Sequence, residues 1–70
     1  MSRIAAIGEA YRVQGLGLAG VLVLTADDPD EVRLRWSALP SEVALVILTP
    51  RADEALADRA VDPLTVVMPR

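Results

Sequence analysis

The 70-residue chain contains no cysteine and no histidine. Without cysteine it can form neither a disulfide framework nor a thiolate metal site. Without histidine it lacks the commonest metal ligand and the usual proton shuttle. Lysine is absent too, and all seven basic residues are arginine, which we interpret as a base-composition bias of the genome rather than as chemistry.

The charge balance and the apolar runs exclude further classes of protein. The formal net charge is −3, so the chain has no basic surface with which to neutralise nucleic-acid phosphates. No apolar run approaches the roughly 20 residues that span a bilayer, and the first residues lack the features of a signal peptide. With 53% hydrophobic residues, we expect a single domain over residues 1–70, soluble and cytoplasmic.

Apolar runs of strand length alternate with helix signals along the whole chain. Asp28 followed by Pro29, and Thr49 followed by Pro50, are typical helix starts, and Glu31 completes a capping box with Asp28. Gly20 is placed to end the first helix in a left-handed conformation. The predicted strands are Ile4–Ile7, Val21–Thr25, Val43–Leu48 and Leu64–Met68, and the predicted helices run over about 9–19, 29–39 and 50–60.

This alternation predicts an α/β fold with a four-stranded parallel sheet and three helices. The likeliest strand order is 2-1-3-4, counted along the chain. It places the first helix on one face and the second and third on the other. A crevice should form where the first and third strands end, around Gly8, Glu9 and Thr49.

Three glycines, Gly15, Gly17 and Gly20, match the dinucleotide-binding pattern G-x-G-x-x-G letter for letter. In dinucleotide-binding proteins that pattern follows the first strand and opens the helix, where free N–H groups meet the pyrophosphate. Here the glycines close the helix, where carbonyl groups are exposed. We interpret them as packing and capping residues and expect no bound cofactor.

The acidic residues around the start of the second helix admit two interpretations. Helix capping and the helix dipole explain Asp27, Asp28, Asp30 and Glu31 without a ligand. A divalent cation is the less favoured alternative. A receiver-type phosphorylation switch is not expected either, because the third strand ends in Leu48 and Thr49 without an acceptor aspartate.

Nothing in the sequence favours catalysis. The serines are Ser2, Ser37 and Ser41; none lies on a strand-to-helix elbow, and no histidine can serve as their base. Of the two aromatic residues, Trp36 lies on the inner stripe of the second helix and is expected in the core. Tyr11 lies off the buried face of the first helix and is the better candidate for contact with a partner.

The run Ile4–Glu9, followed by Val13, Gly15–Leu16 and Leu18–Val21, resembles the small central-stalk protein designated F in the vacuolar and archaeal-type (V/A-type) rotary ATPases. That family opens with a strand of the type IAVIGD and reaches LAGV before its second strand. The acidic helix start at 27–31, the ending at 47–49 and the strand-plus-proline ending at 66–69 extend the resemblance over the whole chain. Leu16 replaces the usual Phe, and the chain stops where family members usually continue into a C-terminal helix.

The resemblance implies a non-catalytic central-stalk subunit of a proton- or sodium-translocating ATPase, bound to the coiled-coil stalk subunit and peripheral to the membrane. It implies no catalytic residue, no metal and no cofactor. One alternative is a small ligand- or nucleotide-binding domain that uses the crevice at Gly8, Glu9 and Thr49. Another is a stand-alone oligomeric scaffold.

One face of the predicted sheet should be only half covered, because the first helix alone lies on it. The third and fourth strands are nevertheless continuous apolar runs, which is the pattern of strands buried on both faces. We therefore expect a protein partner there, or a second copy when the chain is isolated. The candidate interface residues are Tyr11, Arg12, Val46, Leu48, Val66 and Met68.

Overall fold

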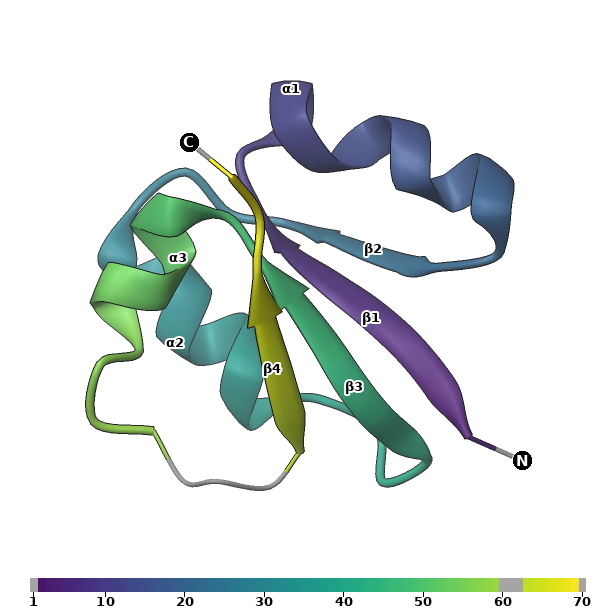
Figure 1. The fold of residues 1–70 in the computed structure, drawn as a ribbon. Helices are drawn as coiled ribbons and strands as arrows, with labels where there is room; N and C mark the ends of the chain where they lie inside the picture. Colours follow the sequence, from purple (N-terminus) through teal and green to yellow (C-terminus); the bar gives the residue numbers. More distant parts are fainter. Residues whose placement is uncertain (1, 60–62, 70) are drawn as a thin grey trace.

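The computed structural model describes residues 2–59 and 63–69 and shows an α/β fold (Figure 1). Four parallel strands form one sheet in the order β2-β1-β3-β4, as the sequence predicts. The strands are β1 (Arg3–Gly8), β2 (Leu22–Thr25), β3 (Val43–Leu48) and β4 (Leu64–Val67). The helices are α1 (Ala10–Val13), the 3-10 helix η1 (Gln14–Ala19), α2 (Pro29–Ser37) and α3 (Pro50–Ala55).

The helices divide between the two faces of the sheet as predicted. Helices α2 and α3 pack against one face, and α1 with η1 lies on the other, where it contacts β1 and β2 (Figure 1). The main core lies under α2 and α3, and the half-buried Trp36 packs against it, which confirms its predicted place. The buried core residues are Ala5, Ile7, Ala26, Val32, Val43, Val46, Leu48, Ala52 and Leu56.

The first helix differs from the prediction. Only one α-helical turn forms after Glu9, and the segment from Gln14 to Ala19 is a 3-10 helix. Gly15 and Gly17 explain the change, because glycine is among the poorest helix formers and the tighter 3-10 geometry suits short segments. Leu18 in this segment is 97% exposed, so it does not face the sheet. Gly20 ends the segment with φ of 82°, which confirms the left-handed cap.

Helix α2 begins as the sequence predicts. Asp28 Oδ1 accepts a hydrogen bond from the backbone N–H of Glu31 at 2.8 Å, and Pro29 occupies the first turn. The reciprocal bond of the expected capping box is displaced by one residue: Glu31 Oε1 accepts from the N–H of Asp27, at 3.3 Å, rather than from that of Asp28. The helix ends at Ser37, before the expected Leu39.

Helix α3 is shorter than predicted. Thr49 caps it by accepting from the N–H of Ala52, but the helix ends at Ala55, and the expected end at Ala60 lies outside the described residues. The guanidinium of Arg59 donates to the carbonyl of Leu56 and to Thr65 Oγ1 of β4, both at 2.9 Å. These bonds hold the edge strand against the turn that follows α3.

Candidate functional site

The face of the sheet opposite α2 and α3 carries two rows of apolar side chains that run across the strands. Paired residues of neighbouring parallel strands project to the same face, and successive residues alternate between faces. The first row joins Ile4, Leu45 and Leu64, and the second joins Ala6, Ile47 and Val66. Ala6 is fully buried beside α1. We name the remaining five residues the bare strip: Ile4, Leu45, Ile47, Leu64 and Val66.

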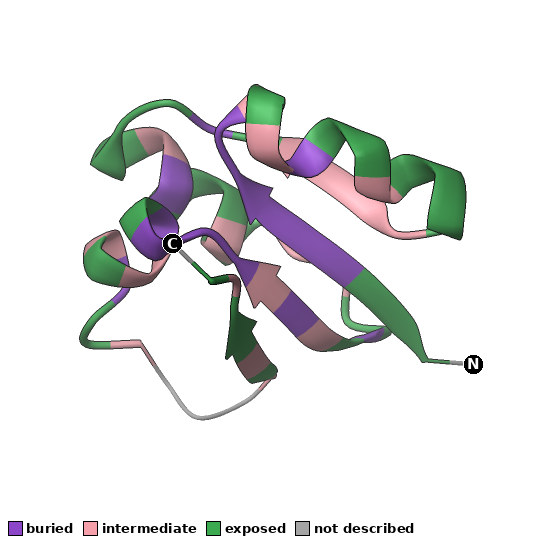
Figure 2. Ribbon diagram, turned by 45° about the horizontal axis from the view of Figure 1, so that its top comes forward, coloured by how far each residue is buried: buried purple, intermediate pink, exposed green. Residues whose placement is uncertain are grey.

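The bare strip is open to solvent. Leu64 is 67% exposed, Val66 52% and Ile4 42%, whereas Leu45 and Ile47 are half-buried. In Figure 2 the ribbon of β4 is green and pink, while the middle of β1 is buried. A contiguous apolar patch of this kind on a small domain is typical of an interaction surface. The expectation that this face is only half covered is therefore confirmed.

Two of the predicted interface residues lie on the wrong face. Val46 and Leu48 are fully buried in the core under α2 and α3. Their neighbours Leu45 and Ile47 occupy the bare strip instead. A continuous apolar run such as Val43–Leu48 carries no alternation from which its face can be read. The face of each residue is set by the register with β1: Leu48 pairs with the buried Ile7 and therefore lies on the same face of the sheet.

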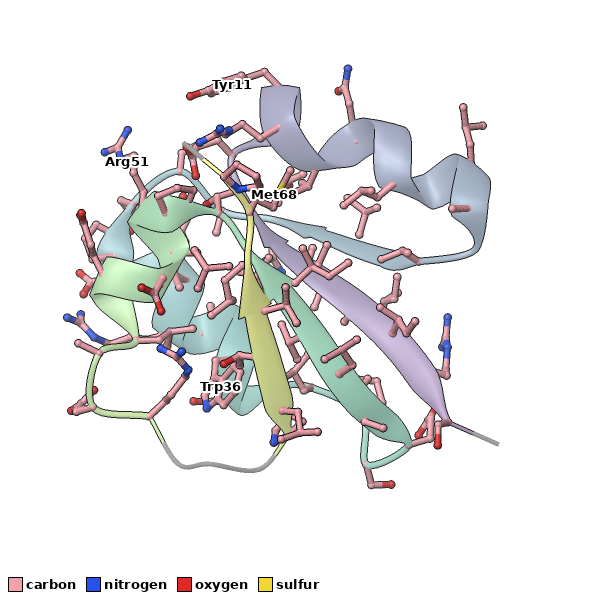
Figure 3. All side chains as sticks on the ribbon, viewed as in Figure 1. Tyr11, Trp36, Arg51 and Met68 are labelled. Atoms are coloured by element: carbon pink, nitrogen blue, oxygen red, sulfur yellow. The ribbon has the colours of Figure 1, made fainter. Side chains whose placement is uncertain are left out.

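The other predicted interface residues lie near the α1 end of the sheet. Val66 is in the bare strip, and the half-buried Met68 follows β4 toward α1 (Figure 3). The guanidinium of Arg12 donates to the carbonyl of Pro69 at 3.0 Å, so it ties the segment after β4 to α1. Tyr11 is 78% exposed, and its hydroxyl donates a long, 3.4 Å hydrogen bond to Glu9 Oε2.

At the crevice predicted between β1 and β3, two side chains are bonded to each other, and one of them, Glu9, also lines an open cleft beside it. The hydroxyl of Thr49 donates to Glu9 Oε1 at 2.6 Å, and both residues are buried. Burial acts to raise the pKa of Glu9. The bond from Thr49, a backbone N–H and the charges of Arg51 and Arg12 outweigh it and hold the pKa below its usual 4.5.

An open cleft of about 280 Å³ remains at the carboxyl ends of β1 and β2, between the starts of α2 and α3. Its charged lining is predominantly acidic, because four carboxylates face two guanidinium groups. Such a lining disfavours the phosphate groups of a nucleotide. Within the described residues, no group of three carboxylates is arranged to hold a metal ion. The lining residues are Glu9, Ala26, Asp27, Asp28, Pro29, Val32, Arg33, Arg51, Glu54 and Ala55.

The glycine motif lies where the sequence predicts, in η1 and at the turn into β2, on the side of the helix away from the crevice. The exposed backbone groups at that end are carbonyls, which repel phosphate. Gly20 has the expected capping role, but the expected packing role is not found at Gly15, which is exposed and where an added Cβ would meet nothing within 4 Å.

Comparisons with family models, with curated proteins and with solved structures found no match to this chain. The resemblance to the small rotary-ATPase stalk protein rests on the sequence motifs and stays a hypothesis.

Proposed function

We propose that the chain is a non-catalytic subunit that binds a protein partner through the bare strip. The exposure of Leu64, Val66 and Ile4 on one continuous face carries this proposal. Parallel sheets are ordinarily covered on both faces, and here β3 and β4 are covered on one. Burying apolar surface stabilises a complex by about 25 cal/mol per Å², so covering the strip offsets part of the cost of association.

The resemblance to the small stalk protein supplies the first partner to test, which is the coiled-coil stalk subunit of a rotary ATPase. In that role the chain would be a rotor component, at the cytoplasmic side of the membrane and peripheral to it. Among the described residues, no helix is long and apolar enough to cross a bilayer. Attachment through a protein partner is compatible with that finding.

The test is calorimetric titration with the coiled-coil stalk subunit, purified from the same source. Val66→Asp places a charge in the strip and should weaken binding at least tenfold, because the carboxylate would have to be desolvated. Leu34→Asp is the matched control: Leu34 is 64% exposed on α2, outside the strip. It should bind as the wild type does. Absence of binding by the wild type, or equal loss in both variants, would overturn the proposal.

The cleft between α2 and α3 supports a second candidate, a small ligand-binding domain. The nucleotide-binding form of this candidate requires ATP to bind in the cleft, whereas the first proposal and the acidic lining predict that it does not. Under the first proposal, ATP at millimolar concentration leaves the NMR amide signals of Ala26, Asp28 and Ala55 unchanged. Saturable shifts at those three residues would favour the second candidate instead.

A further inference from the structure

We infer that the bare strip binds a single amphipathic α-helix of the partner. The inference rests on the proposed function and specifies what the bound segment is. Three observations carry it: the width of the strip, its length along the strands, and the nature of the β4 edge.

The strip is one helix wide. It lies mainly over β3 and β4, and neighbouring strands are about 4.7–4.9 Å apart. Two strands therefore offer a band of about 10 Å, which matches the 10–12 Å diameter of an α-helix with its side chains. The adjoining half of the same face, over β1 and β2, is already covered by α1 and η1 (Figure 1). A helix on the strip would complete the layer that these two elements begin.

The length of the strip also fits a short helix. Its two rows are two residues apart along each strand, which is about 7 Å, and Met68 extends it toward α1. That distance corresponds to between one and two helical turns of 5.4 Å. The partner is thus expected to present apolar side chains at i, i+3 or i+4, and i+7.

The β4 edge is a poor site for an added strand. It has only four residues, Leu64–Val67, so an added strand would gain few ladder hydrogen bonds. The side chains of Leu64 and Val66 stand on the face of the sheet rather than at its edge. A strand paired to β4 would leave most of the strip uncovered.

A second copy of the chain is a weaker fit for the strip than a helix. Standard stable interfaces use about 20–30 residues on each side, and the strip offers five. Two strips placed face to face would bury too little surface for a tight dimer. A helix from a larger partner can contact the strip and the flank of η1 at once.

The experiment uses two synthetic peptides of equal composition and no net charge. The helical peptide carries leucines at i, i+4 and i+7, and the control carries the same number of leucines at alternate positions, as a strand would. Each is titrated into the isotope-labelled chain, with circular dichroism recorded in parallel. We expect the helical peptide to shift the amide signals of Leu45, Ile47, Leu64 and Val66 saturably, to gain helicity, and to bind at least tenfold more tightly than the control.

Two variants localise the contact: Val66→Asp should weaken binding of the helical peptide at least tenfold, and Leu34→Asp should leave it unchanged. Tighter binding by the alternating peptide would indicate that the strip binds a strand. A tight dimer that Val66→Asp dissociates and the helical peptide does not would make it a second copy. Either result, or no binding by the helical peptide, overturns the helix inference. The assay with the purified stalk subunit decides the proposed function separately.

Discussion

The hydroxyl of Thr49 donates a 2.6 Å hydrogen bond to Glu9 Oε1 and accepts one from the N–H of Ala52. One buried side chain thus links the end of β1 to the end of β3 and caps α3. Gly8 permits this arrangement, because a Cβ added there would overlap the Thr49 side chain. Thr49 and Glu9 therefore stabilise the centre of the fold, and the proposed partner surface, the bare strip, does not include them.

Glu9→Gln should make stability depend less on pH. The folded pKa of Glu9 is lowered, so its charged form stabilises the protein above the usual value of 4.5, and this contribution is lost as pH falls through the lower folded value. At neutral pH we expect the variant to be less stable by about 1 kcal/mol, because a charge-assisted bond becomes a neutral one.

Urea unfolding at neutral pH and at steps below pH 4.5 measures this effect. The stability difference between wild type and Glu9→Gln should shrink as the pH falls. Glu42→Gln is the control, because it removes the same charge at an exposed position. A difference that stays constant at every pH would show that the charge of Glu9 plays no part.

Gly8→Ala should destabilise the domain by about 1–3 kcal/mol, the usual cost of overpacking. The added methyl group would displace Thr49 and so disturb both of its hydrogen bonds. Gly15→Ala is the matched control, since a Cβ there meets nothing within 4 Å. It should be neutral or stabilise by about 0.5–1 kcal/mol, by reducing the entropy of the unfolded chain. Equal thermal stability of the two variants would refute this account of Gly8.

Much of the fold could be predicted from the sequence, because it depends on short-range signals and on the order of the elements. The helix starts at Asp28 and Thr49, each followed by a proline, form as predicted, because these caps depend on neighbouring residues. The strand order follows from the βαβ alternation and right-handed crossovers.

The incorrect predictions concern side chains whose surroundings are set by residues distant in the sequence. The faces of Val46 and Leu48 depend on pairing with β1, and a run without alternation does not show them. The bond from Arg59 to Thr65 likewise joins two different elements, so the residues next to Arg59 do not predict it. The half-covered face was predictable, since it follows from the order of the elements, but of the five residues in the bare strip only Val66 was predicted.

Asp28→Ala should cost about 0.5–2 kcal/mol of stability through loss of the α2 cap. Asp30→Ala is the control: its carboxylate forms an exposed ion pair with Arg33, and such pairs contribute about 0–1 kcal/mol. Thermal unfolding with and without magnesium or calcium should give the same ranking. A melting temperature that either cation raises in the wild type but not in Asp28→Ala would mean that the acidic residues bind a cation as well as cap the helix.

The isolated chain should associate weakly with itself through the bare strip. Leu64 and Val66 leave apolar surface in water, and burying it against another copy is favourable. The strip is too small for a tight dimer, so the association should be reversible and visible as a concentration-dependent sedimentation coefficient in the micromolar range. Val66→Asp should sediment as a monomer and bind less of a hydrophobic dye.

Leu34→Asp provides the comparison, because it removes an apolar side chain that is at least as exposed as Val66 but lies on α2, and it should associate as the wild type does. A strictly monomeric wild type without affinity for the dye would contradict the prediction, and with it the stand-alone scaffold hypothesis. If the strip binds a partner helix, the helical peptide should also dissociate the self-associated species. The peptide and a second copy of the chain would compete for the same five side chains. Self-association that persists when the peptide is bound would place the contact between copies on another surface.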